Sequence, residues 1–394
     1  MKIAVIAPTH LPARRANTIQ VMKMTQAFVA LGHTARLCVP TPPGSPADIP
    51  WDELAHHYGL RHHFPVTWLP VYPRLRGYDF AASALRWARA WGADLTYTRL
   101  PQTAALSSVT GVPTIYEIHD RPQGMFGPVV FRAFLRGKGA QRLVVITRAL
   151  ADDLRKEFPN FQSFVIIAPD GVDLARYRDL PDPQTARHTL ELPSPGTRSA
   201  PLPAPRNTRP SLPNRFTAGY TGHLYPGRGA EMLLAIASRL PDVTFLLAGG
   251  NPEDVARVRE QAASQESENV ILTGFVPNTE LPRYQAACDI LLMPYQKRVA
   301  ASSGGDIARY LSPMKLFEYL ACGRAILSSD LPVLQEVLTP KNAALLPPDD
   351  VDAWVSAVRN LQADPEKRAA LAAQARGDAE KYAWEARAAR VLEG

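Results

Sequence analysis

The chain has 394 residues, of which 46% are hydrophobic and 21% charged. This composition is typical of a folded globular protein and excludes a disordered chain, and the length favours two domains over one. No apolar run approaches the roughly 20 residues that a transmembrane helix needs. The first eight residues are too short for a signal peptide and predict a first strand instead.

The net charge of +7 lies in the N-terminal half of the chain. Residues 1–172 carry 19 Lys and Arg against 11 Asp and Glu, a balance of +8, whereas the remainder carries 25 against 26, a balance of −1. An anionic partner of the first half is one interpretation, and a solvated arginine-rich surface is at least as good. Three scattered cysteines, Cys38, Cys288 and Cys322, indicate a reducing, cytoplasmic compartment.

In the first half, short β-branched runs alternate with helical patterns. An amphipathic helix follows the first strand, with Val21 and Phe28 on its apolar face; Asn17 and Gln20 resemble a capping box, and Gly32 is a natural stop. Strands that alternate with helices form parallel sheets covered on both faces. The strands expected here are 3–7, 35–39, 95–98, 114–118, 143–146 and 164–168.

A proline-rich stretch at 180–215 predicts a linker or surface excursion, because it has few large apolar residues. Strands are then expected at 216–221, 243–248, 270–273, 290–294, 325–328 and 343–346, and from Val351 the pattern is helical. The sequence therefore predicts two Rossmann-like doubly wound α/β domains, 1–175 and 216–376, that face a cleft. A C-terminal helix at about 377–394 is expected to pack back on the first domain.

Glycines surround Arg228 where an expected strand ends, since residues 220–231 read Tyr-Thr-Gly-His-Leu-Tyr-Pro-Gly-Arg-Gly-Ala-Glu. Glycines let backbone amides approach an anion, a helix beginning near Gly229 adds partial positive charge, and Arg228 adds a full charge. A tight strand-to-helix turn with a surface arginine is the alternative. The segment alone does not decide between them.

A second segment, 312–323, reads Ser-Pro-Met-Lys-Leu-Phe-Glu-Tyr-Leu-Ala-Cys-Gly, which predicts a helix with proline in its first turn and glycine at its end. Lys315 and Glu318 share one helix face, where they would suit a phosphate and ribose hydroxyls. For such a pair taken alone, a surface ion pair is usually the better interpretation.

Both segments resemble the donor-binding motifs of the retaining family 4 glycosyltransferases. Residues 220–229 are similar to the family's glycine turn, and residues 312–321 to its Ser-Pro-x-Lys donor helix. Further matches occur in family order from near residue 1 to about residue 350. These are Gly32-His33, Ile118-His119-Asp120, Asp170-Gly171-Val172-Asp173, Leu247-Ala248-Gly249 and Gly274-Phe275-Val276.

The resemblance implies the GT-B fold and roles for individual residues. Arg228 stands where the family has a phosphate-binding lysine, Lys315 would face the diphosphate, and Glu318 would hold the ribose. The backbone at 275–276 would meet the base, and His119 would reach the transferred sugar. The implied catalytic residues are thus His119, Arg228 and Lys315, and the donor-binding residues are Gly222, His223, Arg228, Phe275, Val276, Asp306, Ser312, Pro313, Met314, Lys315 and Glu318.

Two positions depart from the family pattern. Tyr310 stands where the first glutamate of the family's Glu-x7-Glu motif belongs, and His223 replaces an arginine beside the glycine turn. Many relatives with the Ser-Pro-x-Lys variant also lack that glutamate. We therefore expect the loop at 304–306 to supply the missing sugar contact through Asp306.

No metal or cofactor is expected besides the nucleotide sugar. Asp350 and Asp352 have the spacing of an Asp-x-Asp metal motif, but they precede a helix that begins near Ala353, so capping is the better interpretation. The histidine pairs at 56–57 and 62–63 have no accompanying cysteine or helical spacing and predict surface loops.

The resemblance thus implies a retaining hexosyltransferase that moves a sugar from a UDP- or GDP-sugar to a glycan or lipid-linked acceptor, in cell-envelope or exopolysaccharide synthesis and without nucleic acid. Alternatives are a sugar-nucleotide epimerase or phosphorylase of the same plan, and a non-catalytic nucleotide-sugar-binding partner subunit, which Tyr310 keeps open. A nicotinamide dehydrogenase is disfavoured, because residues 7–10 lack the Gly-x-Gly-x-x-Gly turn.

Two N-terminal segments, 85–91 and 125–142, combine arginines with aromatic residues. Basic amphipathic helices can lie on anionic membranes, so a peripheral contact with the inner face of the cell membrane is one interpretation. The alternative, with the aromatic side chains in the core and the arginines solvated, is slightly better.

Overall fold

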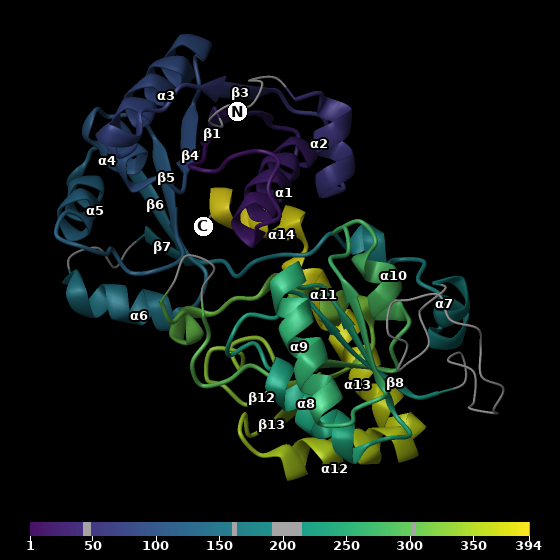
Figure 1. Ribbon diagram of the computed structural model, residues 1–394. Helices are drawn as coiled ribbons and strands as arrows, with labels where there is room; N and C mark the ends of the chain where they lie inside the picture. Colours follow the sequence, from purple (N-terminus) through teal and green to yellow (C-terminus); the bar gives the residue numbers. More distant parts are fainter. Residues whose placement is uncertain (42–48, 160–163, 191–214, 301–304, 394) are drawn as a thin grey trace. The chain divides into compact units, whose positions relative to one another are not determined.

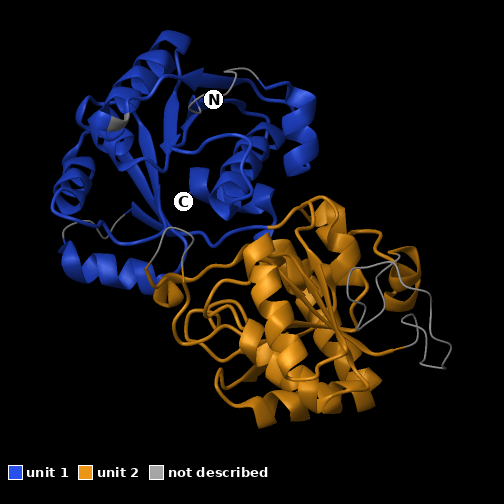
Figure 2. Ribbon diagram, viewed as in Figure 1, with its two compact units in different colours: residues 1–171, 382–394 blue, residues 172–381 orange. Residues whose placement is uncertain are grey.

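The computed structural model describes residues 1–41, 49–159, 164–190, 215–300 and 305–393. The chain forms two compact units, residues 1–171 with 382–394 and residues 172–381 (Figure 2). Each unit contains a parallel β-sheet with helices, so the α/β class predicted from the alternating pattern is confirmed.

In the described part of the first unit the sheet has seven strands in the order β3-β2-β1-β4-β5-β6-β7. The order reverses between β1 and β4, and ligands of such sheets bind beyond the carboxyl ends of the strands at this switch point. The strands are β1 (Lys2–Ile6), β2 (Thr34–Pro40), β3 (Val66–Leu69), β4 (Leu95–Thr98), β5 (Thr114–Ile118), β6 (Ala140–Val145) and β7 (Val165–Ile167).

Helices cover both faces of this sheet. Helices α3, α4 and α5 pack against one another in series, while α14, from the C-terminal end of the chain, lies against α1 (Figure 1). Strands β4 and β5 are buried at every residue, as a sheet covered on both faces requires. The helices are α1 (Ala16–Ala30), α2 (Trp51–Tyr58), α3 (Tyr78–Trp91), α4 (Pro101–Val109), α5 (Gly127–Arg136), α6 (Arg148–Glu157) and α14 (Trp384–Glu393).

The sheet of the second unit has six strands in its described part, in the order β10-β9-β8-β11-β12-β13, with the switch point between β8 and β11. Its strands are β8 (Thr217–Thr221), β9 (Thr244–Ala248), β10 (Val270–Gly274), β11 (Ile290–Met293), β12 (Ala325–Ser329) and β13 (Ala344–Leu346). Helix α8 contacts α9 and α12, whereas α11 contacts α10 and α13. The helices are α7 (Pro183–Thr189), α8 (Ala230–Arg239), α9 (Pro252–Ser264), α10 (Leu281–Ala286), α11 (Met314–Cys322), α12 (Val351–Ala363) and α13 (Pro365–Ala379).

Every strand expected from the sequence is present, within three residues at each end, and β3 is an additional edge strand. The prediction of a capping box is wrong. Helix α1 begins at Ala16 with Arg15 as its N-cap, so Asn17 and Gln20 lie inside the helix. Gly32 does follow the end of α1, with a left-handed φ of 82°. The pair His56 and His57 belongs to α2 rather than to a loop.

The stretch expected as a linker from residue 180 begins instead with helix α7. Asp182 caps it, since its Oδ1 accepts a hydrogen bond from the Thr185 amide at 3.0 Å. Arg187 of this helix is buried and pairs with Asp289 at 3.0 Å. Residues 191–214 of the expected linker lie outside the described residues. Within the described ranges, no helix is both long and apolar enough to cross a bilayer.

Candidate functional site

The glycine turn that was predicted to bind phosphate lies at the switch point of the second sheet. Strand β8 ends at Thr221, and α8 begins after Gly229, its left-handed N-cap. Gly222 has a φ of 131°, and a Cβ atom there would lie 2.8 Å from Lys315 Nζ. Glycine at this position therefore lets the lysine approach the backbone of the turn.

The amine of Lys315 is buried among aromatic rings. Its Nζ lies 3.6 Å from the ring centroid of Tyr220 and 5.5 Å from that of Tyr295. Among the described residues Nζ has no hydrogen-bond partner. Burial holds the pKa of Lys315 well below its ordinary value, and the charge of Arg228 lowers it further, whereas Glu318 opposes the shift. A buried polar atom left unsatisfied is costly, and it marks a candidate ligand site.

Arg228 approaches the same aromatic ring from the glycine turn. Its guanidinium carbon lies 5.8 Å from the ring centroid of Tyr295, and its Nη1 donates a 3.4 Å hydrogen bond to the Tyr295 hydroxyl. Tyr295 follows β11, the neighbour of β8 across the switch point. The structure thus brings together the two cations predicted for the diphosphate, and neither forms an ion pair with a carboxylate in the described part of the chain.

His223 stands beside these cations. Its ring is stacked on Tyr225, with centroids 4.7 Å apart and planes 2° apart. Within the described residues its Nδ1 is buried without a hydrogen-bond partner. Burial lowers the pKa of His223, as do Arg228 and Lys315, while Asp254 opposes them. A neutral ring therefore occupies the position of the family's arginine at pH 7.

Glu318 is buried in α11, and the alternative of a surface ion pair with Lys315 is wrong. The two residues are only 7% and 8% exposed. Glu318 Oε2 accepts a 3.2 Å hydrogen bond from the amide of Gln285, which also donates to Thr221 Oγ1 at 3.0 Å. Lys315 lies in the first turn of α11, where the helix dipole favours an anionic ligand, and Glu318 follows three residues later.

The other predicted donor-binding residues lie on loops around this turn. Phe275, directly after β10, is 43% exposed, whereas Val276 is buried. Pro313 is the N-cap of α11. Asp306 is used within its own loop, since its Oδ1 accepts hydrogen bonds from the amides of Val299 and Ala308, each at 2.9 Å. The remaining members of the predicted set, Ser312 and Met314, are half-buried.

Tyr310 ends a short 3-10 helix (Ala308–Tyr310) and is 9% exposed. A largely buried phenol thus occupies the position of the family's first glutamate. The contact of Asp306 with the transferred sugar stays a prediction, and residues 301–304 of the same loop lie outside the described residues.

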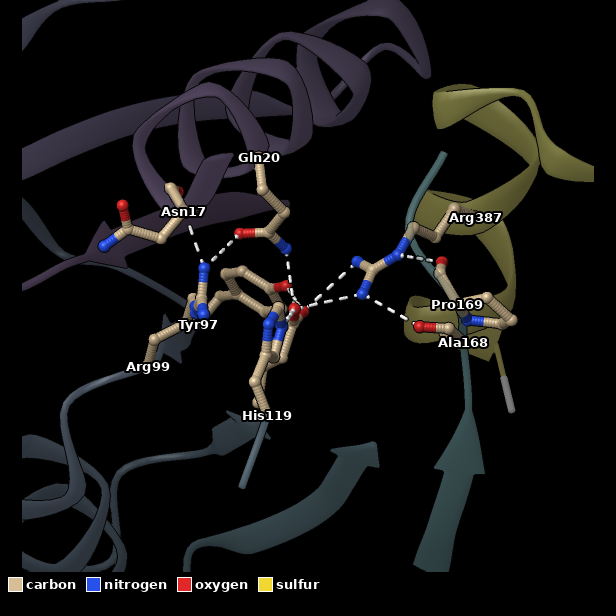
Figure 3. A network of polar contacts seen from close by, with 9 residues as sticks. Asn17, Gln20, Tyr97, Arg99, His119, Ala168, Pro169 and Arg387 are labelled. Carbon is tan, nitrogen blue, oxygen red and sulfur yellow. Dashed lines mark hydrogen bonds and ion pairs between the residues drawn. The ribbon is translucent and has the colours of Figure 1, made fainter. Parts of the chain in front are cut away.

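In the first unit His119 follows β5, and its Nε2 lies 2.5 Å from Oε1 of Glu117. Glu117 is 1% exposed and accepts hydrogen bonds from other elements. Gln20 of α1 donates to Oε1 at 2.6 Å, and the Tyr97 hydroxyl donates to Oε2. Nη1 of Arg99 donates a 3.0 Å hydrogen bond to the amide oxygen of Gln20 (Figure 3).

Arg387 of the C-terminal helix completes this network. Its Nη1 and Nη2 donate to the two oxygens of Glu117 at 3.1 and 3.0 Å, a bidentate ion pair that is almost fully buried. Its Nε donates to the carbonyl of Pro169 at 2.7 Å, and Nη2 donates to that of Ala168 at 3.0 Å (Figure 3). The helix is therefore fixed to the loop that follows β7.

The charges of this network are well defined. Burial would raise the pKa of Glu117, but Arg387 and the hydrogen bond from His119 hold it well below its ordinary value. Burial lowers the pKa of His119, and Arg99 adds to this effect against the opposing charge of Glu117. At pH 7 the carboxylate is therefore ionised and the imidazole is neutral.

Sequence reasoning identified His119 but missed both Glu117 and Arg387. A usable signal was present for the first, since Thr114–Ile118 carries one charged residue in an otherwise apolar strand. A strand buried on both faces must pair such a charge. Nothing in the sequence of α14 distinguishes Arg387 from Arg390, the other arginine of this helix.

In the described ranges, no group of three or more His, Cys, Asp or Glu side chains is placed so that it could hold a metal ion. Asp350 caps α12 by accepting a 3.0 Å hydrogen bond from the Ala353 amide, so the predicted capping role is confirmed. Asp352 pairs with Arg239.

The two basic and aromatic segments differ in exposure. In α3, Trp87 and Trp91 are half-buried and stacked on each other at 6.2 Å, which fits the core interpretation. Phe134 of α5 is also buried. In contrast, three apolar residues at the start of the second segment are exposed by 79%, 57% and 58%, namely Met125, Phe126 and Val129.

Two parallel-sheet α/β units, the second with converging cations at its switch point, define a protein of the GT-B glycosyltransferase fold. Residues 18–176 match the Glycosyltransferase Family 4, and residues 215–364 match the Glycosyl transferases group 1. These matches together span most of the sequence, and the chain belongs to this family of glycosyltransferases. The membership of the glycosyltransferase family that the ordered motifs predicted is therefore confirmed.

Relatives and solved structures agree with this assignment. The chain is 28% identical over 231 residues to a GDP-mannose-dependent alpha-(1-6)-phosphatidylinositol monomannoside mannosyltransferase of Mycolicibacterium smegmatis, covering 57% of this chain and 54% of that protein. It is 24% identical to the phosphatidyl-myo-inositol mannosyltransferase of the same organism, over 100% of this chain and 92% of the other. Its fold is similar to that of HepE of Anabaena, solved in complex with UDP, with a TM-score of 0.73, 17% identity, and 100% and 99% of the two chains covered.

Proposed function

We propose that this chain is a retaining hexosyltransferase that takes its sugar from a nucleoside diphosphate sugar bound by the second unit. The observation that carries the proposal is the meeting of Arg228 and Lys315 at the ring of Tyr295, with Lys315 Nζ unpartnered among the described residues. A diphosphate supplies the negative charge that these groups do not obtain from a carboxylate. Their position beyond the ends of β8 and β11 is where such sheets bind ligands.

The chemical task of these groups is to stabilise the leaving group. Cleavage of the bond between the anomeric carbon and oxygen places negative charge on the diphosphate, and preorganised cations and backbone donors lower that barrier. Arg228 supplies a guanidinium charge, and an arriving anion raises the pKa of Lys315 back toward its ordinary value, because that pKa is held low by burial and by Arg228. Glu318, fixed by Gln285, would accept the ribose hydroxyls.

The donor is proposed to be a UDP- or GDP-sugar, and the acceptor a glycan or a lipid-linked molecule on the cytoplasmic side of the membrane. Support for UDP comes from the HepE complex, and support for GDP from the mannosyltransferase named as GDP-mannose-dependent. Support for a lipid-linked acceptor comes from the two relatives named for phosphatidylinositol substrates. The proposed reaction needs no metal, since Arg228 and Lys315 supply the charge.

A thermal-shift screen with UDP-, GDP- and ADP-sugars tests donor binding, since a ligand at about 100 times its Kd stabilises a protein by about 2.7 kcal/mol. We expect one class to raise Tm in the wild type and in Lys297→Met, an exposed lysine paired with Asp349. Lys315→Met should abolish the shift. If none of the nucleotide sugars changes Tm, or if Lys315→Met binds as the wild type does, the proposal is wrong.

A non-catalytic nucleotide-sugar-binding subunit is the second candidate, favoured by Tyr310 at the position of the family's first glutamate. Incubation with the donor that binds separates the two, because a transferase slowly releases nucleoside diphosphate from it without any acceptor. Binding without release, in the presence of candidate acceptors as well, would favour the subunit. Conversion of the donor into its epimer would indicate an epimerase.

We further propose that the start of α5 contacts an anionic bilayer. Met125 and Phe126, directly before the helix, and Val129 within it are exposed. Two exposed cations, Arg132 and Arg136, follow on α5. Basic helices with exposed apolar side chains bind such surfaces. The wild type and the control Leu31→Ser should float with vesicles of phosphatidylglycerol at low salt, and the double variant Met125→Ser/Phe126→Ser should not. Equal flotation of both variants, or none of the wild type, would contradict this contact.

A further inference from the structure

We propose that Glu117, clamped by Arg387 of the C-terminal helix, is a positioning residue that keeps the proton of His119 on Nε2 and leaves Nδ1 as an acceptor for a sugar hydroxyl (Figure 3). The inference rests on the proposed function, together with the contact between His119 and the transferred sugar that the family resemblance implies. It assigns to the C-terminal helix a part in orienting a catalytic side chain, in addition to its packing on α1.

The hydrogen bond between the two side chains fixes the tautomer. An ionised carboxylate can only accept hydrogen bonds, so the proton in the 2.5 Å contact between His119 Nε2 and Glu117 Oε1 belongs to the histidine. A neutral imidazole carries one proton, and its other nitrogen is then an acceptor. The ring of His119 therefore presents Nδ1 to any hydroxyl that approaches it.

Glu117 can hold the proton on Nε2 of His119 only because several hydrogen bonds fix its own carboxylate. A carboxylate offers about four acceptor sites. Five hydrogen bonds reach this one, from Gln20 on α1, Tyr97 on β4, His119 after β5 and, twice, Arg387 on α14. Because the donors come from four separate elements, the carboxylate cannot turn without breaking several hydrogen bonds.

Arg387 keeps the carboxylate ionised. The side chain of Glu117 is 0% exposed and that of Arg387 is 3% exposed. A carboxylate so deeply buried would take up a proton if its counter-charge were removed, and a protonated Glu117 could donate to His119 instead of accepting from it. The tautomer of His119 thus depends on an arginine that lies 268 residues further along the sequence (387 − 119).

Stability alone does not account for this arrangement. Buried ion pairs are often no more stabilising than well-packed apolar residues of the same volume. The presence of the pair Glu117 and Arg387 in place of apolar side chains therefore calls for another reason. The contact between Glu117 and a histidine after the same strand, near the switch point of the first sheet, supplies one.

The direct test is the ¹⁵N NMR spectrum of the His119 ring in the intact protein without ligand. In the wild type we expect protonated Nε2 and bare Nδ1. In Glu117→Gln, whose amide can both donate and accept, the two tautomers should mix. The double variant Glu117→Gln/Arg387→Met removes both charges, so it avoids an unpaired buried ion and should fold while still mixing tautomers. An unchanged His119 tautomer in both variants would overturn the proposal.

Turnover gives an independent readout, with release of nucleoside diphosphate from GDP-mannose or UDP-glucose as the assay. Both variants should lose roughly 10- to 100-fold in kcat, by analogy with the loss found when the partner of a metal-ligating histidine is replaced, with KM for the donor nearly unchanged. Asp289→Asn breaks another ion pair at the same 3.0 Å distance, between a buried arginine and a half-buried aspartate, at the opposite end of its sheet from the glycine turn. It should lower stability and leave kcat of the folded protein intact; an equal loss of kcat would assign the effect of Glu117→Gln to stability and refute positioning.

Arg387→Met should add a pH dependence that the wild type lacks. Burial would then raise the pKa of Glu117, so kcat should rise with pH as the carboxylate ionises and again accepts from His119. The remaining titratable groups that face Glu117 are His119, Tyr97, Arg99 and Asp170. A flat profile of kcat against pH at the wild-type level would contradict the role of Arg387.

The variant His119→Ala separates the two proposals. If it leaves turnover unchanged, the proposed role of His119 fails. If His119→Ala is slow and Glu117→Gln is not, only this inference fails.

Discussion

Replacing Lys315 with methionine should stabilise the ligand-free protein while it abolishes donor binding. Leaving a buried polar group without a hydrogen bond costs about 1–3 kcal/mol in mutational data. A cation–π contact with Tyr220, at 3.6 Å, returns about 0.5–2 kcal/mol of that. We therefore expect a net gain of about 1 kcal/mol at pH 7, or about 2–4 °C in Tm for a unit of this size.

The pH dependence of this gain has a definite sign. Because the pKa of Lys315 is lower in the folded protein than in the unfolded chain, the unfolded chain binds more protons between the two values. The free energy of unfolding of the wild type therefore rises with pH through this window. The advantage of Lys315→Met should shrink as the pH approaches 10.5, the ordinary value of a lysine.

Chemical denaturation at several pH values, followed by thermal shift with UDP and GDP, measures both effects. Lys23→Met is the matched control, because Lys23 is also buried (1% exposed, against 8% for Lys315) but donates a 2.6 Å hydrogen bond to the Gly59 carbonyl. This substitution leaves a carbonyl unsatisfied, so it should destabilise the protein by about 1–3 kcal/mol. If Lys315→Met is destabilised as Lys23→Met is, and still responds to nucleotide, Lys315 is a structural residue and our interpretation of the site is refuted.

Three further outcomes follow from the same geometry. Arg228→Gln should lose about 10²–10³ in kcat, the cost of removing one donor from an oxyanion site, with Tm nearly unchanged in thermal denaturation. Gly222→Ala should weaken nucleotide binding measured by calorimetry, because its Cβ would lie 2.8 Å from Lys315 Nζ and its φ of 131° disfavours a side chain. Glu117→Gln should be less stable than the wild type at pH 7, and denaturation curves should converge as the pH falls below 4.5, since a carboxylate with a lowered pKa contributes stability above its unfolded value and loses it in acid.

The strands were predictable because a parallel sheet covered on both faces requires short, continuous apolar runs. Strand β3 was not predicted, because it is short and half-buried at all four residues. It also lies at the edge of its sheet, next to Pro65 and Pro70. Helix α7 was not predicted, because the prolines around it suggested a linker. Asp182 followed by Pro183 is nevertheless a helix start, with a capping carboxylate and a proline in the first turn.

The candidate site was predictable to the extent that it lies in local motifs. The turn at 222–229 and the helix with Lys315 and Glu318 could be read from spacing, but the ring that both cations approach could not. Tyr295 follows a strand that pairs with β8 only through the switch in strand order. Glu117 and Arg387 are 270 residues apart, and no local pattern encodes such a pair.

Glu117 in the first unit and Lys315 in the second are both buried ionisable groups, but they differ in how far the protein itself satisfies them. This difference distinguishes a positioning group from a ligand-binding group. Every acceptor site of the Glu117 carboxylate is occupied by the protein, so its charge is neutralised internally and its geometry is fixed before any ligand arrives. Lys315 Nζ, by contrast, donates no hydrogen bond to any of the described residues. Since folding does not satisfy this amine, an anion is its natural partner, and the binding of a nucleoside diphosphate should raise the pKa of Lys315 and take up protons in the pH range where the amine titrates.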